Sequence, residues 1–144
     1  MVMLSSGDHK ARSFRLLRCP HHDLVNSRTL SNPEQTAQAL CDVFGWQIRW
    51  RGPSQMGGNT VHVGTADDYL AVYTFDGNTA GSGRTGKLKG GLNHVGVLVD
   101  DLDATEQRVI EAGFEPFNHM TYDPGRRFYY LDADGIEFEV VSYA

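Results

Sequence analysis

The sequence predicts an α+β fold made of two β-α-β-β-β modules, and three observations lead to that prediction. First, the second half of the sequence aligns with the first half when it is shifted by 68 residues. Residues 113–114 then fall on 45–46 and 137–140 on 69–72, and both halves have the same order of features. Second, one segment of each half has apolar residues spaced near 3.6, as in an amphipathic helix. Third, the segments that follow alternate with a period of two, as strands do.

Each half opens with a short strand and continues into a helix whose start is recognisable. In the second half the strand covers 94–99 and carries three valines on one face. Asn32 and Pro33 in the first half, and 100–103 in the second, suit a helix N-cap and first turn. Gly113 lies where the second helix should end. The apolar helix positions are Ala37, Leu40, Cys41, Phe44, Ala104, Val109, Ile110 and Phe114.

Three strands are predicted after each helix. Turn-forming residues at 123–125 and 132–135 separate the strands of the second half. A Gly-rich segment at 76–91 joins the halves and matches the GxxxxGK pattern of a phosphate-binding loop. However, Leu88 stands where that loop has Ser or Thr, and the following sequence does not suit the start of a helix. Both points argue against a nucleotide site. The predicted strands are 46–52, 59–65, 69–75, 115–120, 126–132 and 136–143.

Composition limits the classes of function. The chain has 144 residues, of which 40% are hydrophobic and 22% charged, so one globular domain is expected. A net charge of −5 without a basic stripe argues against nucleic acid and anionic membranes as partners. No apolar run approaches the ~20 residues of a membrane span, and two cysteines form no disulfide framework, so a cytoplasmic protein is expected. Residues 1–20 form a polar leader, which we expect to be disordered.

The stretches LNHVGVLVDDLDA and YYLDADGIEFEVVSY, with the paired modules, resemble the vicinal oxygen chelate superfamily of glyoxalases, bleomycin-resistance proteins and extradiol dioxygenases. The resemblance covers about 24–144. It implies a curved mixed sheet around a cleft, with the helices outside, and a homodimer. We therefore expect a single domain at 21–144, with modules at 21–75 and 92–144.

The same resemblance implies a divalent metal ion in the cleft, held by His94 and Glu139 in the second module. Strand alternation turns both side chains away from the helix-packed face. A neutral imidazole and a carboxylate suit zinc, iron, manganese, nickel or cobalt. In the first module Val25 and Ala71 stand at the matching positions and bind no metal. His22 is the candidate third ligand, if a bulge or another register turns it inward.

Other polar and aromatic residues are candidates for the same cleft. Glu137 is the candidate general base, or else a solvated carboxylate at the rim. One of the two arginines after the 123–125 turn should face inward and clamp an anion, or both should simply keep the hairpin soluble. Most aromatic residues in strands are core, but some should form the cleft walls. The candidate substrate-binding residues are His62, Tyr73, Arg127 and Tyr129.

Two classes of function remain open on this evidence. One is a metal-dependent enzyme, a lyase, isomerase, dioxygenase or transferase, acting on a small oxygenated metabolite that meets the metal ion through its oxygens. The other is a metal-free protein that sequesters a small aromatic or cationic molecule, as bleomycin-resistance members do. A fold shared by both cannot decide between them.

Overall fold

The computed structural model describes residues 3–5, 25–29, 31–54, 57–74, 89 and 93–144. Its helices are α1 (Pro33–Phe44) and α2 (Leu102–Glu111). Its strands are β1 (Met3–Ser5), β2 (Val25–Thr29), β3 (Gln47–Pro53), β4 (Asn59–Gly64), β5 (Tyr69–Tyr73), β6 (Val95–Leu98), β7 (Phe117–Tyr122), β8 (Gly125–Leu131) and β9 (Glu137–Ser142). The order β2-α1-β3-β4-β5 followed by β6-α2-β7-β8-β9 is the β-α-β-β-β order predicted for each half.

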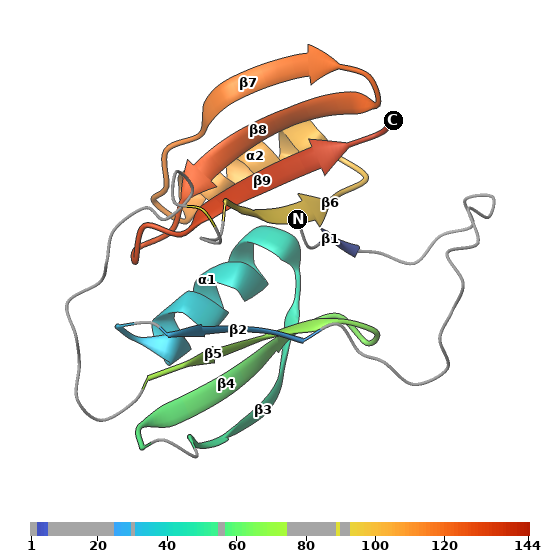
Figure 1. Cartoon of the computed structure of the whole chain (residues 1–144). Helices are drawn as coiled ribbons and strands as arrows, with labels where there is room; N and C mark the ends of the chain where they lie inside the picture. The colour runs from blue at the N-terminus through green and yellow to red at the C-terminus, as the bar shows by residue number, and fades with distance from the viewer. Residues whose placement is uncertain (1–2, 6–24, 30, 55–56, 75–88, 90–92) are drawn as a thin grey trace.

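The strands form two mixed sheets instead of one continuous curved sheet (Figure 1). One has the order β1-β6-β9-β8-β7 and the other the order β2-β5-β4-β3. In each sheet the first strand of the module runs parallel to the last, and the remaining module strands pair antiparallel. The edge of β6 that a continuous sheet would need is paired with β1, a piece of the leader that we had not predicted as a strand. The other residues of that leader lie outside the described part.

The helix ends follow the capping chemistry that the sequence predicts. The Asn32 side chain accepts a hydrogen bond from the N–H of Gln35, Pro33 begins α1, and Gly45 ends it in the left-handed conformation. At the end of α2 the cap is Ala112, and Gly113 follows it with a φ of 88°. The prediction of the second helix end was therefore one residue late.

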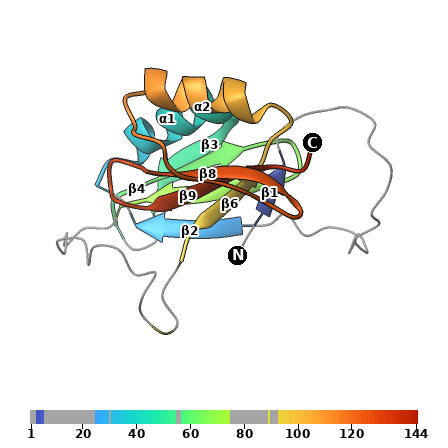
Figure 2. The same cartoon turned by 90° about the horizontal axis from the view of Figure 1, so that it is seen from above.

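Both helices lie side by side against the sheets (Figure 2), and one apolar core joins the modules. The ring of Phe44 on α1 lies 6.3 Å from that of Phe138 on β9. Arg108 on α2 donates a 2.7 Å hydrogen bond to the carbonyl of Val43 at the end of α1. Ile110, which we expected on the apolar face of α2, is 50% exposed instead. Neither described helix has the length and apolar character that a membrane crossing requires.

Asp132 organises the turn between β8 and β9. Its Oδ1 accepts hydrogen bonds from the backbone N–H groups of Asp134 at 2.9 Å and Ile136 at 2.8 Å. Asp134 in turn accepts the N–H of Ser31, beside the start of α1, at 3.1 Å. Burial raises the pKa of Asp132 to about 6, and the hydrogen bonds to its carboxylate offset only part of that effect.

The raised pKa of Asp132 predicts a loss of stability as the pH rises from about 4 to 6. In that range the unfolded chain has released this proton and the folded chain retains it, so rising pH favours unfolding. The Asp132→Asn variant keeps the Oδ1 acceptor and removes the titration. We expect it to exceed the wild type in free energy of unfolding by at most about 3 kcal/mol near neutral pH, and by little near pH ~4.

Urea unfolding at both pH values measures this difference, with Asp67→Asn in the exposed β4–β5 turn as the control. The difference in free energy of unfolding between the control variant and the wild type should be the same at both pH values. A gain for Asp132→Asn that is the same at both pH values would contradict the prediction, because it would not come from this titration.

Candidate functional site

Glu139 is the centre of a buried polar cluster on the five-stranded sheet. Its neighbours on β9, Phe138 and Val140, point into the apolar core, and alternation turns Glu139 to the opposite face. The residue is only 1% exposed. Its Oε1 accepts a 2.8 Å hydrogen bond from Nη1 of Arg127 and a 3.0 Å hydrogen bond from the hydroxyl of Tyr129. Both donors come from β8, the strand paired with β9, so strand pairing brings them to the carboxylate.

His94, just before β6, meets the other oxygen of this carboxylate. Its Nε2 lies 3.0 Å from Oε2 of Glu139. The geometry of this contact is not that of a hydrogen bond, and both atoms are buried with no hydrogen-bond partner in the described part of the chain. On the other side of the ring, Nδ1 contacts Oδ1 of Asn93. Because a carbonyl oxygen only accepts, Nδ1 carries the hydrogen there, and a neutral His94 presents a lone pair at Nε2.

Nε2 of His94 and Oε2 of Glu139 therefore lie close together without the alignment of a hydrogen bond. Such an arrangement is unfavourable unless a cation lies between or beside them, either a second proton on the imidazole or a metal ion. Two ligands at right angles on an octahedral ion, each at about 2.1 Å from it, lie about 3.0 Å apart. Side chains that bind a metal ion usually have their other polar atom held by a hydrogen bond from outside the coordination shell. The partners on Nδ1 of His94 and Oε1 of Glu139 are of that kind. The pair thus fits two ligands of a divalent metal ion.

Further ligands do not come from the residues described in the structure. No group of three or more His, Cys, Asp or Glu side chains in that part of the chain is placed to hold a metal ion. His22, the candidate third ligand, lies outside the described residues. A pair of protein ligands leaves the remaining coordination positions to water, to a substrate or to a residue beyond that part.

Arg127 is buried at 8% exposure, whereas its neighbour Arg126 points outward and pairs with Asp103 on α2 at 3.1 Å. The guanidinium carbon of Arg127 lies 4.1 Å from the ring centroid of Tyr122. Burial acts to lower the pKa of Arg127, but the hydrogen bond and charge of Glu139 outweigh it, so the pKa is raised. The side chain is therefore a permanent cation beside the carboxylate.

Tyr129 shares the site with His94, and their rings lie edge to face at 5.8 Å. Burial, with the hydrogen bond and charge of Glu139, raises the pKa of Tyr129 to about 12. The phenol therefore stays protonated at neutral pH and acts as a hydrogen-bond donor. It is poorly suited to accept a proton from a substrate.

The sheet register shows why the first module has no matching pair. Gly96 lies opposite Glu139 in one sheet, and Ser27 lies opposite Ala71 in the other. Val25 therefore takes the place in β2 that His94 takes in the strand leading into β6. This agrees with the positions assigned from the sequence repeat.

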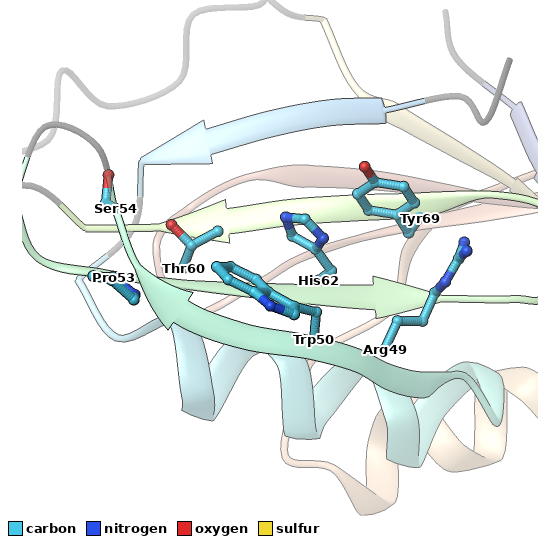
Figure 3. A pocket seen from close by; sticks show the side chains of 7 residues that line it. All are labelled: Arg49, Trp50, Pro53, Ser54, Thr60, His62 and Tyr69. Atoms are coloured by element: carbon cyan, nitrogen blue, oxygen red, sulfur yellow. The ribbon is translucent and has the colours of Figure 1, made fainter.

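The first module instead carries an aromatic pocket of about 560 Å³ (Figure 3). His62 on β4 lies between two aromatic rings, with centroid distances of 4.9 Å to Trp50 and 4.6 Å to Tyr69. The guanidinium of Arg49 lies 4.9 Å from the centroid of Tyr69. Burial and the charge of Arg49 lower the pKa of His62. This surface suits a planar ligand, and its neutral imidazole adds no charge at physiological pH.

The structure thus distributes the predicted site residues over two sheets. His94, Arg127, Tyr129 and Glu139 lie together on one, and His62 lies in the aromatic pocket of the other. Glu137 shares the strand face of Glu139 and is partly exposed. Tyr73 is half-buried on β5, two residues beyond Ala71, and does not line the aromatic pocket. Their roles stay predictions.

Sequence reasoning missed several residues of these sites, among them Asn93 and Tyr69. Asn93, which contacts the ring of His94, directly precedes it in LNHVG, so its place in the sequence was the available signal. Tyr69 shares a strand face with Tyr73, but only the pairing of β4 with β5 brings it beside His62.

The sequence as a whole assigns the chain to a family. The model of the Glyoxalase/Bleomycin resistance protein/Dioxygenase superfamily matches residues 27–140, and the chain belongs to that superfamily. No curated protein matches the chain. A glyoxylase/bleomycin resistance protein/dioxygenase domain from Frankia sp. EAN1pec superposes with a TM-score of 0.69 at 17% identity, covering 85% of this chain and 96% of that one.

Two other solved structures represent two kinds of function. The antibiotic binding protein TnmS3 from Streptomyces sp. CB03234 has a TM-score of 0.65 and 23% identity, with 86% of this chain and 97% of that chain covered. The fosfomycin resistance protein FosX from Mesorhizobium loti has a TM-score of 0.61 and 18% identity, with 85% and 91% covered. At these identities the likeness concerns the fold alone.

Proposed function

We propose that this chain is a divalent-metal-dependent enzyme that acts on a small oxygenated molecule. One observation carries the proposal: Nε2 of His94 and Oε2 of Glu139 are buried 3.0 Å apart, and neither forms a hydrogen bond with any of the described residues. The other polar atoms of the two side chains do have partners. Nδ1 of His94 contacts Asn93, and Oε1 of Glu139 accepts hydrogen bonds from Arg127 and Tyr129. A bound cation explains why those two atoms are left without partners.

In this proposal His94 and Glu139 hold the ion, which would act as a Lewis acid on a substrate oxygen. Arg127 and Tyr129 keep Oε1 occupied and so direct Oε2 toward the ion. Glu137, on the same strand face, is the candidate for moving a proton to or from the substrate. The reaction class remains among lyase, isomerase, dioxygenase and transferase chemistry, since a shared fold does not decide among them.

Elemental analysis tests this proposal on tag-free protein purified without chelator, incubated with zinc, manganese, nickel, cobalt or iron(II), and then gel-filtered. About one ion per chain is expected for at least one of these metals. The matched control is His119→Ala, which removes a surface histidine whose Nε2 contacts Glu106 at 2.8 Å, and which should retain the ion. Protein that retains no ion under any of these conditions would contradict the proposal.

A second candidate function, metal-free sequestration of a planar molecule, is favoured by the aromatic pocket. Trp50 is 46% exposed there, and Trp46, the other tryptophan, is buried. A guest that stacks in the pocket should quench the fluorescence of Trp50, and Trp50→Phe should abolish the quenching. If the protein is such a binder, His94→Ala should leave guest binding intact. Guest binding that depends on both the ion and His94 would instead support the enzyme.

A further inference from the structure

A second pocket, of about 360 Å³, lies on the helix side of the fold, away from the strand face of Glu139. Residues of α1 form one wall, and Phe114 after α2 together with Tyr130 and Asp132 at the end of β8 forms the other. The pocket therefore lies between the two modules, since α1 belongs to the first module and the other wall to the second.

One buried polar atom of a residue that lines this pocket has no hydrogen-bond partner among the described residues. Oδ2 of Asp132 is buried and forms no hydrogen bond within the part of the chain that the structure describes, although Oδ1 of the same carboxylate accepts two backbone N–H groups. The two hydrogen bonds that hold the turn involve only Oδ1. They therefore give no reason why Oδ2 is buried without a partner. Tyr130, which is 1% exposed, lines the pocket beside Asp132. Unpartnered buried groups of this kind are rare and indicate a missing ligand or water.

The charge of the pocket selects the ligand. Asp42 on α1 adds a second carboxylate, which accepts a 2.8 Å hydrogen bond from Gln38. None of the described residues that line the pocket is a lysine or arginine. A ligand that donates hydrogen bonds and carries positive charge would therefore meet two carboxylates without a competing cation. Leu40 and Phe114 supply an apolar wall for the remainder of such a ligand.

We propose that this intermodule pocket binds a small primary amine attached to an apolar or aromatic group. The ammonium group would donate to Oδ2 of Asp132, and the apolar group would lie against Phe114 and Leu40. Such a ligand would touch both modules at once. The proposal does not depend on the metal-dependent function proposed above.

Benzylamine is the probe, with benzyl alcohol and benzoate as neutral and anionic analogues of similar size. Titrations of ¹⁵N-labelled full-length protein, followed by amide chemical shifts, locate the binding. Benzylamine should shift signals of 132–136 and 38–42, and benzoate should not. Asp132→Asn, which keeps the Oδ1 acceptor, should weaken benzylamine binding by about tenfold or more. Asp67→Asn, an exposed acid outside the pocket, should leave it unchanged.

A second variant guards against a change in the turn itself. Ala39→Phe places a ring in the pocket from the side of α1 and should block benzylamine while the β8–β9 turn keeps its sequence. The proposal is overturned if benzylamine does not bind, if benzoate binds equally well, or if Asp132→Asn retains wild-type affinity. Shifts confined to the aromatic pocket around Trp50 and His62 would also overturn it.

Discussion

Replacing Arg127 by Met is expected to lower the free energy of unfolding by about 3–5 kcal/mol, the usual cost of leaving one partner of a buried ion pair without its counter-charge. The carboxylate of Glu139 is 1% exposed, and Arg127 is the one cation that donates to its Oε1 among the described residues. The hydroxyl of Tyr129 would remain but carries no charge. Urea unfolding in the presence of a chelator measures the loss without a contribution from bound metal.

Arg126→Met is the matched control for this experiment. Arg126 forms a two-point ion pair with Asp103, but both side chains are largely exposed, so the change should have little effect on stability. The double variant Arg127→Met/Glu139→Gln should be more stable than Arg127→Met alone, because it removes the unpaired buried charge. If Arg127→Met costs no more than Arg126→Met, Glu139 is not held as a buried ion.

Removing either proposed ligand is expected to weaken zinc binding by more than ~100-fold. Removal of an outer partner of a metal ligand commonly weakens binding by about 10–100-fold, and loss of the ligand itself should exceed that. His94→Ala removes the imidazole and Glu139→Gln the carboxylate. Tyr129→Phe, which removes only a donor to Oε1, should fall within the smaller range. Competition with a chromophoric chelator measures all three affinities.

The order of the three affinities is as informative as their size. His119→Ala, which breaks an exposed His–Glu contact, should bind zinc as the wild type does. Should His94→Ala also retain wild-type affinity, zinc would be bound elsewhere. The 3.0 Å contact between His94 and Glu139 would then be that of a protonated histidine with its carboxylate.

Much of the fold could be predicted because the local signals agree with the tertiary structure. Asn32, Pro33 and Gly45 each have one favoured place at a helix end, and strand alternation correctly separates Phe138 from Glu139. The separation into two sheets could not be predicted, since it depends on which strand pairs with the edge of β6. Three residues of the leader, Met3–Ser5, take that place, and nothing in their composition marks them as a strand.

Those features of the site that depend on a single strand could be predicted, and those that depend on strand pairing could not. Alternation places Glu139 on its face, whereas the contacts of Arg127 and Tyr129 with it depend on the register between β8 and β9. The same holds for the aromatic pocket, in which pairing of β4 with β5 brings Tyr69 beside His62. The homodimer and the cytoplasmic location stay predictions.

Anomalous scattering of zinc, in crystals grown with that ion, tests most directly whether His94 and Glu139 hold a metal ion. One peak is expected about 2.0–2.2 Å from both Nε2 of His94 and Oε2 of Glu139. Arg127 and Tyr129 should remain on Oε1. The contrary result is a structure with no peak at that position, in which Nε2 of His94 donates a hydrogen bond directly to Oε2 of Glu139.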